Sequence, residues 1–149
     1  MDVLVDTGVL LRAFDRSLPE QPTIFRAFRE LWSQNHQLAT TLQNIAEFWN
    51  VSTRPVQARG GFGLPVAIVD ARVKLIERLG DVLPFPDRAY QEWRRLVAAH
   101  QIVGVAVHEA KLVATMNVAK IQHVLTMNAA DFQRYPGLTI WTPDDVVQS

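Results

Sequence analysis

The sequence predicts an α/β fold in which helices cover both faces of a parallel β-sheet. Short apolar segments that end in turn-forming residues alternate along the chain with longer segments of helical periodicity. Such alternation is typical of right-handed crossovers between parallel strands. The chain has 149 residues, the size of one domain, and 48% of them are hydrophobic, which is enough for a core. We therefore expect a single domain over residues 1–149.

The composition excludes several classes of function. The chain has no cysteine, so disulfides, thiolate metal ligands and thiol nucleophiles are excluded. Basic and acidic residues both number 15, which gives no whole-surface attraction for nucleic acid, although 12 of the 15 basic residues are Arg and suit local phosphate contacts. No apolar run approaches the roughly 20 residues of a membrane helix, and no secretion signal is visible. We expect a cytoplasmic protein without a membrane anchor.

In the first third of the chain, apolar runs and helical spacing predict the elements in order. Helix 21–34 follows from Ile24, Phe28 and Leu31, which recur at helical spacing. The next helix has Thr41 as a favourable N-cap and Pro55 just beyond its end. The expected elements are a strand over 2–6, a short helix over 9–13, a helix over 21–34, a brief strand over 37–40 and a helix over 41–54.

The rest of the chain begins with a loop. Residues 55–65 hold three glycines and two prolines, which predicts a mobile excursion within the domain. The expected elements after it are a helix over 66–79 that stops at Gly80, a strand within 81–85, a helix opened by Pro86 and Asp87, a nearly all-apolar helix over 104–117, a strand over 124–126, a turn with Asn128 and Asp131, and a strand over 138–141. The tail after Pro143 is short and polar.

Four acidic residues stand at or near the ends of predicted elements: Asp6, Glu47, Glu109 and Asp131. The carboxyl ends of parallel strands meet at one edge of a sheet, and ligands of open α/β sheets bind there. Asp6 and Asp131 each follow a strand, and Glu109 begins a helix at the same edge, so we expect these three to converge. The position of Glu47 depends on the fold. Two simpler interpretations stay open: Asp6 as a helix N-cap, and the four acids as unrelated surface groups.

A cluster of carboxylates implies a divalent cation, because unpaired like charges repel. Oxygen ligands without cysteine favour Mg²⁺ or Mn²⁺, and such a site activates water for phosphoryl displacement. Two other motifs fail. His108 and Glu109 begin an H-E-x-x-H pattern, but the fifth residue is Leu112. A receiver-like or phosphatase-like domain is disfavoured because the second acid expected near the end of the first strand is missing.

Four segments, in this order and spacing, resemble PIN-domain proteins of the VapC type, which are ribonuclease toxins of toxin–antitoxin pairs. They are VDTGVLLRAF, NIAEFW, VHEAKLVATM and VLTMNAADFQRYPGL. The resemblance covers the chain roughly from Val3 to Pro143. It implies a five-stranded parallel sheet and an endoribonuclease that depends on Mg²⁺ or Mn²⁺. It also implies that the metal is bound by Asp6, Glu47, Glu109 and Asp131.

The resemblance further implies supporting residues and partners. Thr7, Thr126 and Asn128 match positions that support the site or orient water. The expected partners are an RNA substrate, a second copy of the chain in a homodimer, and a VapB-type antitoxin. The antitoxin would lay a segment in an apolar groove between helices 21–34 and 66–79 and direct an Arg to the carboxylates. Arg54 and Arg59 are the candidates for RNA contact, and an ordinary surface loop is the simpler interpretation of that segment.

Two residues depart from the family pattern and motivate a second hypothesis. Glu109 stands where the family usually has Asp, which moves the carboxylate one methylene outward. Gly8 stands where the family usually has Asn, which removes a hydrogen-bonding group near the site. The alternative function is therefore a PIN fold with weakened or lost catalysis that serves as a binding module.

Overall fold

The computed structural model describes all 149 residues, and its centre is a five-stranded sheet in which every neighbouring pair is parallel. The strands are β1 (Asp2–Val5), β2 (Gln37–Thr41), β3 (Gly80–Leu83), β4 (His123–Leu125) and β5 (Thr139–Trp141). Their spatial order is β3-β2-β1-β4-β5. The chain therefore builds the sheet outward from β1 in one direction and then returns to build it in the other. The predicted fold class and strands are confirmed.

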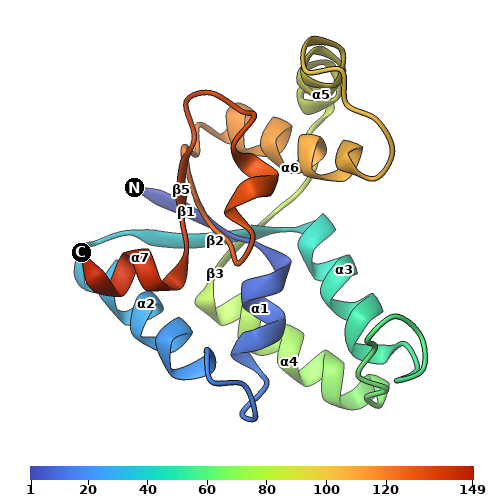
Figure 1. The fold of residues 1–149 in the computed structure, drawn as a ribbon, viewed down its shortest axis with the longest axis vertical. Coiled ribbons are helices and arrows are strands. Elements are labelled where there is room, and N and C mark those ends of the chain that lie inside the picture. Colours follow the sequence, from blue (N-terminus) through green and yellow to red (C-terminus); the bar gives the residue numbers. More distant parts are fainter.

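Helices cover both faces of the sheet, as the alternating pattern predicts (Figure 1). One face carries α1 (Thr7–Ala13), α2 (Gln21–Ser33), α3 (Leu42–Thr53), α4 (Val66–Leu79) and α7 (Pro143–Gln148). The other face carries α5 (Asp87–Ala99), α6 (Ala106–Ala119) and the short 3₁₀ helix η1 (Ala129–Phe132). None of these helices is both long and apolar enough to span a membrane.

The central strand β1 supplies both cores because its side chains alternate between the two faces. Val3 and Val5 lie in the core beneath α1 to α4, whereas Leu4 lies in the core beneath α5 and α6. All three side chains are buried, which explains why this strand has a continuous apolar sequence. The acidic residue that follows, Asp6, is thereby fixed at the carboxyl edge of the sheet.

Two helix ends show how local sequence sets the elements around the site. The Thr41 hydroxyl accepts a hydrogen bond from the Asn44 N–H, so α3 begins immediately after β2. Helix α4 ends before Gly80 as predicted, but Gly80 is extended (φ 171°) and not left-handed. A Cβ there would lie 1.7 Å from the Leu38 carbonyl oxygen. Glycine is thus needed for the close approach of β3 to β2, and not for a helix stop.

The C-terminal tail, expected only to be short and polar, forms the helix α7. The Thr142 hydroxyl accepts from the Asp145 N–H, and the Asp145 carboxylate accepts from the Thr142 N–H, which together form a capping box. Pro143 follows the cap at the first helical position, where its missing N–H is harmless. Val146 packs into the larger core, so α7 covers part of the sheet beside α2.

The segment 55–65 has no helix or strand, as predicted, and it folds back on the end of α3. Its backbone N–H groups at Phe62, Gly63 and Leu64 donate to carbonyls at the end of α3 at 2.9–3.0 Å. These hydrogen bonds hold the segment as a closed loop between α3 and α4. Its expected mobility stays a prediction.

Candidate active site

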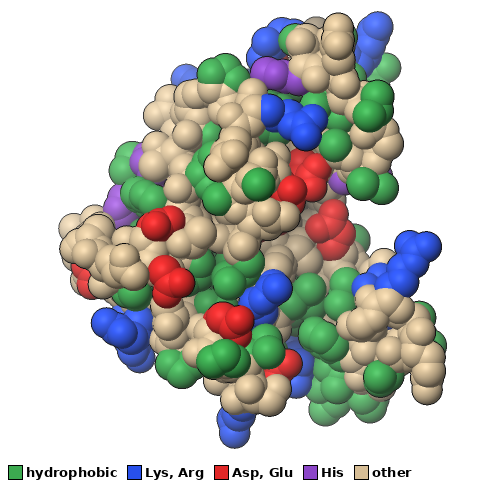
Figure 2. All heavy atoms as spheres, viewed as in Figure 1, with side chains coloured by type: hydrophobic (Ala, Val, Ile, Leu, Met, Phe, Trp, Pro, Cys, Tyr) green, Lys and Arg blue, Asp and Glu red, His purple; other side chains and the backbone are tan.

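A cavity of about 300 Å³ opens at the carboxyl edge of the sheet, where β1 and β4 lie side by side. The order of strand building reverses between these two strands, and this is the point at which open α/β sheets bind ligands. Acidic side chains gather in a hollow on this face (Figure 2). The cavity is lined by Asp6, Thr7, Gly8, Arg12, Gln43, Glu47, His108, Glu109, Leu112, Thr126, Met127, Asn128 and Asp131. All four predicted acids are therefore brought together.

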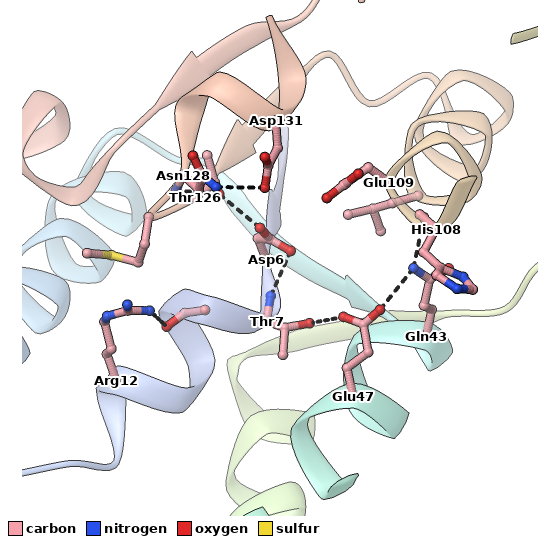
Figure 3. Close-up of a pocket in the computed structure, with 13 residues that line it drawn as sticks. Asp6, Thr7, Arg12, Gln43, Glu47, His108, Glu109, Thr126, Asn128 and Asp131 are labelled. Carbon is pink, nitrogen blue, oxygen red and sulfur yellow. Dashed lines mark hydrogen bonds between the residues drawn. The ribbon is translucent and has the colours of Figure 1, made fainter. Parts of the chain in front are cut away.

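Asp6 lies at the centre of the cavity, and its interpretation as a helix N-cap is confirmed. It caps α1, because its Oδ1 accepts from the Thr7 N–H at 2.9 Å. Its Oδ2 accepts from the Thr126 hydroxyl at 2.9 Å and faces the cavity (Figure 3). Burial raises the pKa of Asp6 above its usual value, and the charges of Glu47 and Asp131 raise it further. The carboxylate is thus held rigidly in surroundings that oppose its charge.

Glu47 reaches the cavity from α3 and is oriented by two donors. The Thr7 hydroxyl donates to Oε2 at 2.7 Å, and the Gln43 amide donates to Oε1 at 3.1 Å. The same Gln43 amide also donates to the His108 carbonyl at 2.9 Å. Gln43 therefore ties Glu47 to the start of α6, where Glu109 lies.

Asp131 is placed by the turn that follows β4. The Asn128 amide donates to Asp131 Oδ2 at 2.9 Å, and the Asn128 N–H donates to the Thr126 hydroxyl at 3.1 Å. Because this hydroxyl also donates to Asp6, Thr126 links the two strand ends through one oxygen atom. Its side chain is fully buried.

Glu109 projects from the first turn of α6 toward Asp6 and Asp131, and its carboxylate has no hydrogen-bond partner in the protein (Figure 3). Partial burial raises the pKa of Glu109, and the charges of Asp131 and Asp6 add to this, while Arg134 opposes it. Glu109 is therefore the acid whose charge is least compensated by hydrogen bonds.

A family model of the PIN domain matches residues 3–138 of the chain. The chain belongs to the PIN-domain family. No curated protein matches the chain significantly. The PIN-domain resemblance of the sequence is thereby confirmed, and the matched range includes all 13 residues that line the cavity.

Solved structures of low sequence identity share this PIN fold. VapBC2 from Rickettsia felis, bound to promoter DNA, aligns with a TM-score of 0.69 at 14% identity over 95% of this chain and 98% of that one. DNA-bound VapBC from Salmonella typhimurium aligns with a TM-score of 0.69 at 16% identity, over 96% of this chain and 98% of that one. VapC20 from Mycobacterium tuberculosis, a Sarcin-Ricin loop cleaving toxin, aligns with a TM-score of 0.63 at 18% identity, over 89% of this chain and 95% of that one. At such identities the likeness is one of fold.

The donor set of the PIN cavity suits a hard divalent cation. Carboxylate oxygens are the ligands that Mg²⁺ and Mn²⁺ prefer, and burial and mutual repulsion raise the pKa values of Asp6 and Glu109, which a bound cation would reverse. In the arrangement described here, however, no three acidic or histidine side chains lie close enough together to hold one ion. The site has the right chemistry, and direct binding of one ion by three or more of these side chains requires them to draw together.

Two polar residues of the site were missed in the sequence. Asn44 is 1% exposed, and its amide donates to the Thr7 hydroxyl at 2.9 Å and to Asp6 Oδ1 at 3.4 Å. Its position three residues before Glu47, on the same helix face, was an available signal. Gln43 lies four residues before Glu47 on the same helix face, which was an equal signal, but its contact with His108, 65 residues away, had none.

The two arginines predicted to contact RNA do not line the cavity. Arg54 follows the last residue of α3, and its guanidinium donates to the Arg59 carbonyl at 2.6 Å. Arg59 is exposed in the loop 55–65, with a positive φ of 50°. Their contact with RNA stays a prediction, and it requires a substrate that extends beyond the cavity.

Replacing Thr126 with valine is expected to destabilise the protein by about 1–3 kcal/mol, because the buried Asp6 carboxylate and the Asn128 N–H both lose a partner. Urea unfolding measures this change. Thr40→Val is the matched control, since Thr40 is also buried, lies on β2 and donates to the Val5 carbonyl outside the cavity. Both variants lose stability, but only Thr126→Val is expected to lose RNA cleavage as well. Equal cleavage by both would contradict the linking role of Thr126.

The metal-free protein is expected to lose stability relative to Asp6→Asn as the pH rises above about 4. The raised pKa of Asp6 means that the unfolded chain releases this proton first. Ionisation in the folded state then costs free energy, which the asparagine variant avoids. Urea unfolding of both proteins in chelator, over a series of pH values, measures the difference. Curves that stay parallel would show that Asp6 titrates normally.

Proposed function

We propose that this PIN-domain protein is a metal-dependent endoribonuclease toxin that a cognate VapB-type antitoxin holds inactive. One observation carries the proposal: the four acids of the PIN pattern, which come from four separate segments, line a single cavity at the carboxyl edge of the sheet. The fold neighbours support it, since they include VapBC complexes and a Sarcin-Ricin loop cleaving toxin.

In the proposed mechanism Asp6, Glu47, Glu109 and Asp131 would hold Mg²⁺ or Mn²⁺, which would supply activation of water and stabilisation of the charge that develops on the phosphate. The protein supplies orientation. Thr126 and the Thr7 N–H fix the two oxygens of Asp6, and the Thr7 hydroxyl fixes Glu47. Asn128 fixes Asp131. These donors set the directions of three carboxylates before substrate enters, which lowers the entropy lost in reaching the reactive geometry.

The first test of the ribonuclease activity is cleavage of purified ribosomal RNA by the isolated protein. With Mn²⁺ or Mg²⁺, fragments with defined ends are expected, and with excess chelator the RNA stays intact. Cleavage that persists in chelator would contradict the role of the metal. No cleavage with either metal would contradict the ribonuclease function.

The antitoxin part of the proposal rests on exposed apolar side chains of α2 and α4, the two helices between which the antitoxin segment is expected to bind. Phe25 and Trp32 on α2 are 42% and 43% exposed, and Ile68 and Leu75 on α4 are 45% and 49% exposed. Such residues suit an amphipathic segment of a partner. Co-expression with a small neighbouring reading frame that encodes a DNA-binding protein tests this, because relief of growth inhibition and co-purification are expected together. The homodimer stays a prediction.

A second candidate function is a binding module with a PIN fold. The separation of the carboxylates and the Glu at position 109 favour it. A Mn²⁺ titration by calorimetry distinguishes the two functions. A ribonuclease is expected to bind Mn²⁺ in a way that Asp6→Asn weakens, whereas a module without catalysis would show no carboxylate-dependent binding.

A further inference from the structure

One basic side chain lies on the wall of the acidic cavity. Arg12, on the second turn of α1, is half-buried and is the single Lys or Arg among the 13 lining residues. In the view of Figure 3 its guanidinium lies on the side of Asp6 away from Glu109. A cation at this position faces the space that a substrate would occupy.

Arg12 does not neutralise the acids beside it. The ion pairs of the structure are Lys74–Asp70 and Arg95–Glu92, so no carboxylate of the cavity lies within 4.0 Å of the Arg12 guanidinium. Its hydrogen bond is donated by Nη1 to the Gly8 carbonyl at 3.1 Å. A guanidinium has five N–H donors, so most of them are left for a ligand.

Gly8 provides the room in which the guanidinium lies. A Cβ at position 8 would be 3.1 Å from Arg12 Nη1 and 3.7 Å from the Met127 Cβ. Any longer side chain would therefore compete with Arg12 for this part of the cavity wall. The guanidinium of Arg12 can occupy this space because position 8 has no side chain.

The charge of the cavity indicates the ligand. A phosphodiester that enters meets four carboxylates, and one divalent cation offsets only two of those charges. Arg12 is the remaining fixed cation on the wall, and a guanidinium donates two parallel hydrogen bonds to phosphate oxygens. Building on the proposed ribonuclease function, we propose that Arg12 binds a backbone phosphate of the RNA strand beside the bond to be cleaved. Arg12 is thus a substrate-binding residue, and Gly8 makes its position available.

The test measures RNA binding apart from cleavage. Asp6→Asn serves as the background, and a short fluorescein-labelled single-stranded RNA of randomised sequence is titrated by fluorescence anisotropy over a range of KCl concentrations. Adding Arg12→Ala is expected to raise Kd about tenfold at low salt and to reduce the slope of log K against log salt by about 0.7. Arg12→Lys is expected to keep the slope with an intermediate Kd, because it retains the charge without the planar donor pair.

Arg26→Ala is the matched control, since Arg26 is exposed on α2 and lies outside the cavity. It removes the same charge and is expected to leave Kd and slope nearly unchanged. Arg12→Ala with the Kd and slope of the background would overturn the proposal, as would an equal loss for Arg26→Ala. If Arg12→Ala melts at a lower temperature, the same titration is repeated with Arg12→Gln, which keeps a long polar side chain without the charge. The proposal then requires this variant to show the same reduction in the slope of log K against log salt.

Failure of this inference and failure of the proposed function give different results. If the wild type cleaves ribosomal RNA and Arg12→Ala cleaves it with the same kcat/KM and salt dependence, the role of Arg12 alone is wrong. If the wild type cleaves nothing with either metal, the ribonuclease function is wrong. The anisotropy slopes then still decide whether Arg12 contacts RNA phosphate.

Discussion

Replacing Asp6 with asparagine is expected to abolish RNA cleavage, with a loss in kcat/KM of roughly a thousandfold or more. Asp6 is the acid at the centre of the cavity, with both oxygens held in fixed directions by Thr7 and Thr126. A neutral amide in the same place cannot hold a divalent cation with comparable strength, because one of its two oxygens has become an NH₂ donor. Growth inhibition by the expressed protein is expected to disappear together with cleavage.

The fold is expected to survive this substitution. Asparagine keeps an Oδ1 that accepts from the Thr7 N–H, so the cap of α1 is retained. The new NH₂ group faces the Thr126 hydroxyl, which can accept a hydrogen bond as well as donate one. Removing a charge that burial and the neighbouring acids oppose also offsets any weakening of these contacts. In chelator at neutral pH, the variant should be at least as stable as the wild type.

Cleavage assays and thermal unfolding of the same preparations check both halves of this prediction. Asp2→Asn is the control, since Asp2 lies at the exposed opposite end of β1 and is expected to change neither activity nor stability. Mn²⁺ is expected to raise the Tm of the wild type and of Asp2→Asn, but not that of Asp6→Asn. Undiminished cleavage by Asp6→Asn would mean that the chemistry lies elsewhere.

Much of the fold follows from the sequence because its inner strands β1, β2 and β4 are mostly buried on both faces. The run from Val3 to Val5 must be apolar throughout, and this distinguishes it from the helices around it. The failures have equally physical causes. Helix α7 is too short to show periodicity, and the capping box of Thr142 and Asp145 is the only feature of the sequence that indicates it. The function of Gly80 depends on a carbonyl of β2 that lies more than 40 residues earlier in the sequence.

The candidate site is predictable to a similar degree and for a related reason. Asp6 and Asp131 follow strands, so the parallel sheet alone brings them to one edge. Glu47 could be assigned only through the family resemblance, because nothing local says where α3 crosses the sheet. Gln43 contacts His108, 65 residues away, and Arg12 lies on the wall of a cavity built from four segments, so these placements exist only in the folded chain. No spacing rule reports such contacts.

Position 109 gives the second large effect. Glu109 has no hydrogen-bond partner, and burial raises its pKa, with three acidic neighbours adding to the shift; a bound cation would favour the charged form. Glu109→Gln removes the charge at constant size and is expected to lower kcat by about a hundredfold. Glu77→Gln on the exposed face of α4 is the control and is expected to have no effect.

Glu109→Asp separates charge from reach at the same position. The shorter side chain restores the residue that the PIN pattern usually has, so cleavage is expected to be retained or raised. A measurement of kcat with Mg²⁺ and with Mn²⁺ adds the geometric test, because Mg²⁺ demands near-ideal octahedral geometry at about 2.0–2.1 Å. If the extra methylene of glutamate holds the carboxylate off this geometry, Glu109→Asp gains more with Mg²⁺ than with Mn²⁺. Loss of activity in Glu109→Asp would mean instead that this chain has rebuilt its cavity around the longer acid.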